Sequence, residues 1–230
     1  MWNIDLTLVD VARISRDAYA EAFRRVTGRP LVALPQLAGA SDSEIFFESL
    51  ALNEALPGMG QTEDNDLLTR YAAELATAFS ARTDLLAKQG RALPGAREAL
   101  AATSRLPHVI QTVLTGTIRQ NAVHKLHAFD LDRYLDLGIG GFGSDVYPKG
   151  TQILRSLAMG AEKYGVQLSP GGAVYVADSV RDVVAAKVGG IRCVGVATGR
   201  SRVSELRDAG ADPVLADLSD TSRVVAAIGR

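Results

Sequence analysis

Cysteine is nearly absent from this chain of 230 residues, which contains only Cys193. An intramolecular disulfide is therefore excluded, and cysteine usage offers no support for secretion. Cys193 lies in the apolar run of residues 191–196, and no partner for a catalytic thiol is apparent. We therefore expect a buried cysteine in a strand.

The chain also lacks an excess of charge of either sign and any long apolar run. Lys plus Arg number 25 and Asp plus Glu number 26, for a net charge of −1. Without a basic excess, neither nucleic acid nor an acidic membrane surface is an expected partner. No run approaches a membrane span, and no basic and apolar leader opens the chain. We expect a soluble cytoplasmic protein, monomeric or homodimeric, that holds any anionic ligand through a few local charges.

The second half of the sequence alternates short apolar runs with amphipathic stretches. The apolar runs predict strands, and the amphipathic stretches predict helices by their spacing. Predicted strands cover residues 109–114, 173–176, 193–196 and 213–215, and predicted helices cover residues 121–129, 152–163, 180–188, 202–208 and 219–228. This alternation is typical of βαβ units with a parallel sheet.

The segment of residues 12–90 has a different pattern, with helical spacing and no convincing strand. We predict helices over residues 12–26, 45–52 and 64–88, with residues 57–60 as a break. Ser41 and Glu44 have the spacing of a capping box before the second helix. The chain is therefore predicted to be an α/β protein. Residues 1–11 and 91–230 would form its core, and residues 12–90 an all-helical insert.

Polar side chains occur in four clusters near the expected strand ends, where open α/β sheets bind ligands. The clusters are Asn3 with Asp5, Thr115 with Gly116, Lys149, and Asp178 with Asp182. If the first segment is extended, Asn3 and Asp5 point the same way. Each cluster alone is weak evidence, because a Thr-Gly pair is often a turn and Asp178 could simply cap the next helix.

In this order, the four clusters resemble the motifs of the haloacid dehalogenase superfamily. Those motifs are Asp-x-Asp-x-Thr, an apolar strand ending in Ser or Thr, a Lys or Arg, and an acidic motif ending in Asp. The resemblance extends over the whole chain and includes a helical cap between the first two motifs, as in the phosphoglycolate phosphatase and β-phosphoglucomutase branch. It implies a Rossmann-like three-layer core with a parallel sheet and a mobile helical cap over the strand ends.

The resemblance also implies roles for individual residues. Position 3 would attack phosphorus to form an aspartyl-phosphate, and Asp5 would protonate the leaving alcohol and then activate water. Thr115, the Gly116 N–H and Lys149 would bind the phosphate of a small phosphorylated metabolite. Mg²⁺ would be held at Asn3, Asp5 and Asp178, with Asp182 behind these ligands.

The main departure from the family pattern is Asn3, which stands where the family has the nucleophilic aspartate. An amide oxygen is a poor nucleophile, although it can still coordinate a metal. A second departure is Gly150 after Lys149, where proline is frequent. We predict a Mg²⁺-dependent phosphatase whose turnover is impaired by Asn3. The alternatives are a catalytically silent protein that binds a phosphorylated ligand and a sugar-phosphate mutase; a dehalogenase is disfavoured because it needs no acid at position 5.

Overall fold

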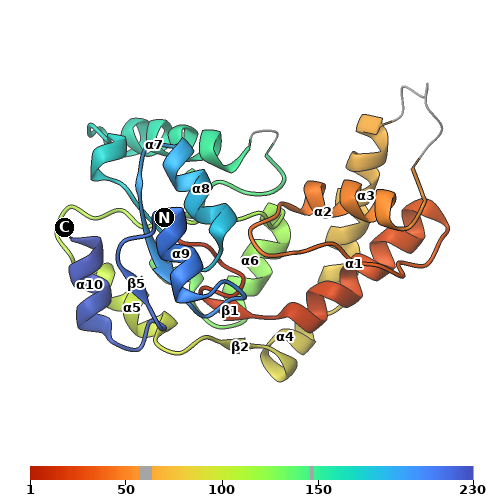
Figure 1. The fold of residues 1–230 in the computed structure, drawn as a ribbon, viewed down its shortest axis with the longest axis horizontal. Coiled ribbons are helices and arrows are strands. Elements are labelled where there is room, and N and C mark those ends of the chain that lie inside the picture. Colours follow the sequence, from red (N-terminus) through yellow and green to blue (C-terminus); the bar gives the residue numbers. More distant parts are fainter. Residues whose placement is uncertain (57–63, 146–147, 230) are drawn as a thin grey trace.

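The computed structural model describes residues 1–56, 64–145 and 148–229, and its centre is a parallel sheet (Figure 1). The strands β3 (Val174–Ala177), β4 (Arg192–Val196) and β5 (Val214–Leu215) pair in the order β3-β4-β5, all parallel. The predicted α/β fold with a parallel sheet is therefore confirmed.

The N-terminal segment extends this sheet on the β3 side. Trp2 forms parallel bridges with both Val176 and Val113, so it lies between two neighbouring segments. Leu114 in turn bridges Gly141. The predicted strand over residues 109–114 is wrong in extent, because only Val113 and Leu114 have bridge partners there.

Helices cover both faces of the sheet, which gives three layers. Val174, Val176 and Val194 belong to one buried cluster, whereas the alternate residues Tyr175 and Cys193 belong to another. This alternation follows from the two-residue period of a strand, and it places the predicted buried cysteine in the second cluster. In Figure 1, α7 and α8 lie along one side of the sheet and α5 and α10 along the other. The helices of this lobe are α5 (Ala96–Thr103), α6 (Arg119–His127), α7 (Lys149–Tyr164), α8 (Val180–Val188), α9 (Val203–Ala209) and α10 (Thr221–Ile228), with short 3-10 turns at Asp132–Tyr134, Leu137–Ile139 and Pro170–Gly172.

Four helices form a second lobe beside the sheet, hereafter the helical lobe (Figure 1). They are α1 (Ala12–Thr27), α2 (Asp42–Leu52), α3 (Asp64–Ser80) and α4 (Thr83–Gln89). The described residues of this lobe contain no strand. Its two connections to the sheet lobe pair with each other, since β1 (Val9–Asp10) lies antiparallel to β2 (Arg91–Ala92).

The capping box before α2 is present, because Ser41 Oγ accepts a hydrogen bond from Glu44 N and Ser41 N donates one to Glu44 Oε2. The single long helix predicted over residues 64–88 is wrong. It is divided at Arg82, which has non-helical backbone angles and forms an ion pair with Glu21 of α1 at 2.5 Å. The predicted break at residues 57–60 lies outside the described residues. Within the described part of the chain, no helix has the length and apolar character needed to cross a bilayer.

An aromatic pair contributes to the packing between α2 and α3. Phe46 is fully buried, and its ring stacks on Tyr71 with centroids 4.0 Å apart and planes 14° apart. Its neighbour Phe47 is 40% exposed. The two adjacent phenylalanines therefore have different surroundings, since Phe46 lies in the core and Phe47 is partly in solvent.

We expect Phe46→Ala to lower the free energy of unfolding by about 3–5 kcal/mol, because a large buried ring is removed and a cavity remains. The matched control Phe47→Ala should cost less than about 1 kcal/mol, since much of that ring is already hydrated. Urea denaturation of both variants measures the difference. Equal losses would contradict the packing described here.

Candidate functional site

A turn at residues 6–8 follows the first sheet segment, directly after Asn3 and Asp5. Leu8 N donates to Ile4 O at 2.9 Å, and Leu6 has a positive φ of 58°. The chain is therefore not extended beyond Asp5. A residue distant in the sequence stabilises this turn, because Thr198 Oγ1 donates to Leu6 O at 2.6 Å.

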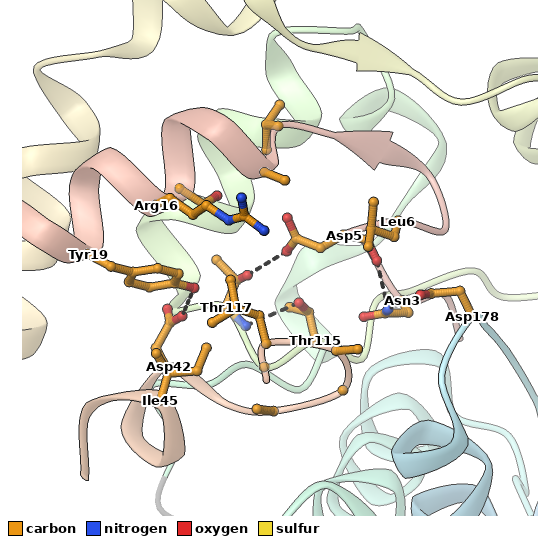
Figure 2. Close-up of a pocket in the computed structure, with 18 of the residues that line it drawn as sticks. Asn3, Asp5, Leu6, Arg16, Tyr19, Asp42, Ile45, Thr115, Thr117 and Asp178 are labelled. Carbon is orange, nitrogen blue, oxygen red and sulfur yellow. Dashed lines mark hydrogen bonds between the residues drawn. The ribbon is translucent and has the colours of Figure 1, made fainter. Parts of the chain in front are cut away.

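A pocket of about 350 Å³ lies between the two lobes at this turn (Figure 2). Six of the seven predicted site residues line it, namely Asn3, Asp5, Thr115, Gly116, Lys149 and Asp178. Asp182 is fully buried and lies behind Lys149. These residues span most of the sequence, and the parallel sheet brings them to one edge.

Asn3 and Asp178 are in direct contact on one wall of the pocket. Asn3 Nδ2 donates to Asp178 Oδ1 at 2.9 Å, and Thr7 Oγ1 donates to the same oxygen at 2.7 Å. Burial, reinforced by the negative charge of Asp182, raises the pKa of Asp178 to about 7. Gly199 packs so closely that a Cβ there would lie 1.9 Å from Asp178 Oδ2. Asp178 is thus enclosed and has little freedom to move.

Asp182 binds Lys149 and anchors it at the pocket. Lys149 Nζ lies 2.5 Å from Asp182 Oδ1 and donates to Gly39 O at 3.1 Å. Tyr175 OH also donates to Asp182 Oδ1, and Ser179 Oγ donates to Asp182 Oδ2. The cap of α8 is the Ser179 side chain, which accepts from Asp182 N, so capping is not the role of Asp178.

The Thr115–Gly116 loop touches the helical lobe through its backbone. Asp42 N, at the start of α2, donates to Gly116 O at 2.8 Å, and Ile118 N donates to Asp42 Oδ2 at 2.8 Å. A Cβ on Gly116 would lie 2.1 Å from Ala40 O, so no other residue fits there without a shift. Burial is the largest cause that raises the pKa of Asp42.

Asp5 is held by two residues that the sequence analysis did not single out. Lys125 Nζ lies 2.8 Å from both carboxylate oxygens of Asp5, and Thr117 Oγ1 donates to Asp5 Oδ2 at 2.8 Å. The Lys125 side chain is only 2% exposed. The sequence contains one indication of this role, because Lys125 lies three residues after Ala122 on the apolar face of a predicted helix. A lysine on such a face is buried only when it has a partner there.

The chemistry of the wall around Asn3 fits a divalent cation. Hard oxygen donors suit Mg²⁺. Asp178 Oδ1 and the Asp5 carbonyl oxygen lie close together, since both accept from Asn3 Nδ2, and a rotation of the Asn3 amide would turn its oxygen toward them. Both Asp178 and Asp182 are buried, and Lys149 pairs with Asp182, so Asp178 in its charged form has no cationic partner among the described residues. Asn3 Nδ2 donates both to Asp178 Oδ1 and to Asp5 O at 3.1 Å, so the amide now bridges two of these oxygens. Among the described residues, no cluster of three or more His, Cys, Asp or Glu side chains could bind a metal by itself.

Comparisons with solved structures agree with this architecture. A hydrolase from Pseudomonas syringae is 22% identical with a TM-score of 0.67, the match covering 96% of this chain and 94% of that one. A HAD hydrolase of family IA, variant 3, from Entamoeba histolytica HM-1:IMSS is 17% identical with a TM-score of 0.69, covering 100% and 98%. A predicted phosphoglycolate phosphatase from Haemophilus somnus 129pt is 18% identical with a TM-score of 0.62, covering 97% and 95%. At these identities the likeness shows the fold alone.

A search of curated proteins found no match. The family model of the haloacid dehalogenase-like hydrolases, however, matches residues 1–187, a span that contains all seven predicted site residues. Because that model covers most of the chain, the protein belongs to the haloacid dehalogenase-like hydrolases.

Proposed function

We propose that the chain is a Mg²⁺-dependent phosphatase for a small phosphomonoester, acting through an aspartyl-phosphate and impaired by Asn3. The supporting observation is the shared pocket, where Asp5, Thr115, Lys149 and Asp178 surround position 3. In this proposal residues 1–11 and 91–230 are the core, and residues 12–90 are a cap that covers the site.

Each remaining group has a task in that reaction. The Gly116 N–H and the Thr115 hydroxyl bind phosphate oxygens, and Lys149 offsets negative charge on the phosphate. Asp5 gives a proton to the leaving oxygen and takes one from water. Asn3, Asp178 and the Asp5 carbonyl would hold Mg²⁺, which would supply further charge neutralisation at the phosphate. What the chain lacks is a carboxylate at position 3 to attack phosphorus.

A silent binding protein is the second candidate, and the contacts of Asn3 favour it. Asn3 Nδ2 donates to Asp178 Oδ1, to Asp5 O and, at 3.4 Å, to Thr7 Oγ1. A carboxylate cannot donate any of these hydrogen bonds. The amide thus stabilises the site in a form that binds without efficient turnover.

We expect Asn3→Asp to gain Mg²⁺-dependent hydrolysis of at least one small phosphomonoester, at least 10³-fold above the unmodified chain, or about 4 kcal/mol of transition-state stabilisation. The reason is that in-line attack needs a carboxylate, whereas the other groups only position charge. Phosphate release across a panel of phosphomonoesters, with and without Mg²⁺, measures the gain.

Two controls make this experiment decisive. Asn3→Ala should stay inactive, and adding Asp5→Asn to Asn3→Asp should remove the gained activity because proton transfer is lost. If Asn3→Asp remains inert while the unmodified chain binds phosphomonoesters, the binding protein is the correct function. Rapid turnover by the unmodified chain would show that another group is the nucleophile.

We also propose that Lys125 is a positioning residue for Asp5. Its ammonium contacts both carboxylate oxygens and also donates to Thr117 Oγ1 at 3.0 Å. It lies 5.5 Å from the ring centroid of Phe79 in α3, so the helical lobe packs against it. The Asp5 carboxylate is 37% exposed, and without these contacts it could rotate into the pocket.

In the Asn3→Asp background, Lys125→Met should lower kcat by about 10- to 100-fold, because Asp5 loses its fixed orientation. KM should change little, because Lys125 does not line the pocket. The control Lys88→Met removes an exposed lysine of α4 and should leave both constants unchanged. Steady-state kinetics separates the two constants, and a change confined to KM would show that Lys125 acts on binding.

A further inference from the structure

The pocket extends well beyond what a phosphate group needs. Its volume of about 350 Å³ lies within the range of roughly 300–1,000 Å³ seen for small-molecule sites. The wall supplied by the helical lobe and its connections is mostly apolar and includes Val11, Leu34, Pro35, Leu37, Ala38 and Ile45. An apolar part of a ligand would therefore be desolvated favourably against this wall.

Two polar residues interrupt that apolar wall without partners of their own. Ser15 is 6% exposed, lines the pocket, and its Oγ has no hydrogen-bond partner among the described residues. A buried hydroxyl of this kind is costly unless something satisfies it. Its neighbour Arg16 also lines the pocket and has no ion pair with any described residue. By contrast, Tyr19 and Asp42 on the same wall satisfy each other at 2.7 Å.

The direction of Arg16 relates it to the leaving group. Figure 2 shows its guanidinium pointing across the pocket toward Asp5, the proposed proton donor to the leaving oxygen. The other exposed arginine at the pocket, Arg200, follows Gly199, which packs on Asp178 at the cation side. Arg16 is therefore the arginine on the side of the leaving group.

We infer that the substrate is the phosphomonoester of an alcohol with an apolar body and a carboxylate, which Arg16 binds while Ser15 donates to a polar atom of the same group. A guanidinium matches a carboxylate in both charge and geometry. This inference rests on the proposed function, because it uses Thr115 and Lys149 as the phosphate side of the pocket. It makes Ser15 and Arg16 determinants of specificity.

Three aryl esters of one shape test this inference: phenyl phosphate, 3-carboxyphenyl phosphate and its neutral analogue 3-carbamoylphenyl phosphate. The unmodified chain with Mg²⁺ allows equilibrium binding to be measured by calorimetry. We expect the carboxyphenyl ester to bind about five- to tenfold more tightly than the carbamoyl ester, the scale of one charge-assisted hydrogen bond at a partly exposed site. The same order should hold for kcat/KM in the Asn3→Asp variant.

Arg16→Gln should remove this preference, so that the carboxyphenyl ester binds no more tightly than the carbamoyl ester. Arg13→Gln is the matched control, since it removes an exposed arginine of α1 that does not line the pocket and should keep the preference. Ser15→Ala should weaken binding of the carboxyphenyl ester about two- to threefold without lowering the melting temperature, because the hydroxyl has no partner to lose.

The inference is overturned if Arg16→Gln and Arg13→Gln behave alike, if the preference follows Arg200→Gln, or if the carboxyphenyl and carbamoyl esters bind equally. In each of these cases hydrolysis of phenyl phosphate by Asn3→Asp would leave the proposed function intact. If no ester binds to the unmodified chain and none is hydrolysed by Asn3→Asp while a wider phosphomonoester panel is also inert, the proposed function fails as well.

Discussion

The parallel pairing of the N-terminal segment with its two neighbours is the constraint on which the site depends. Trp2 bridges Val113 on one side and Val176 on the other. The residues that follow in each segment therefore emerge at the same edge, which places Asn3 beside Thr115 and Asp178. A shift of this register by one residue would turn the Asn3 side chain to the opposite face of the sheet. The chemistry of the pocket is thus a consequence of backbone pairing.

Charge compensation explains why acidic residues can be buried at that edge. Asp182 is neutralised by Lys149, and Asp5 by Lys125. Asp178 has only neutral hydrogen-bond donors, and burial raises its pKa. A buried carboxylate without a cationic partner is unstable in its charged form. An amide at position 3 therefore stabilises Asp178 by donating a hydrogen bond to it, and the cation in the proposed function would compensate the same charge.

The helical lobe closes the pocket through polar contacts made by its backbone. The Gly39 carbonyl accepts from Lys149, and Asp42 exchanges hydrogen bonds with the loop that contains Gly116. Lys149, which is proposed to bind phosphate, therefore also contacts the lobe, and so does the backbone of the loop that contains Gly116. If the proposed function holds, binding of a phosphorylated ligand would be coupled to the position of the lobe, since both would use Lys149 and the loop at Gly116.

The sequence by itself determined the parallel α/β sheet, the capping box at Ser41 and the residue types at four strand ends, because periodicity and capping are local properties. It also identified the substitution at Asn3. The tertiary structure alone decided the break at Arg82, where the side chain pairs with the distant Glu21, and the partners of Asp5. Lys125 lies 120 residues from Asp5 in the chain, and no local pattern predicts which carboxylate a buried lysine will meet. Long-range pairs are selected by packing, so only the folded chain specifies them.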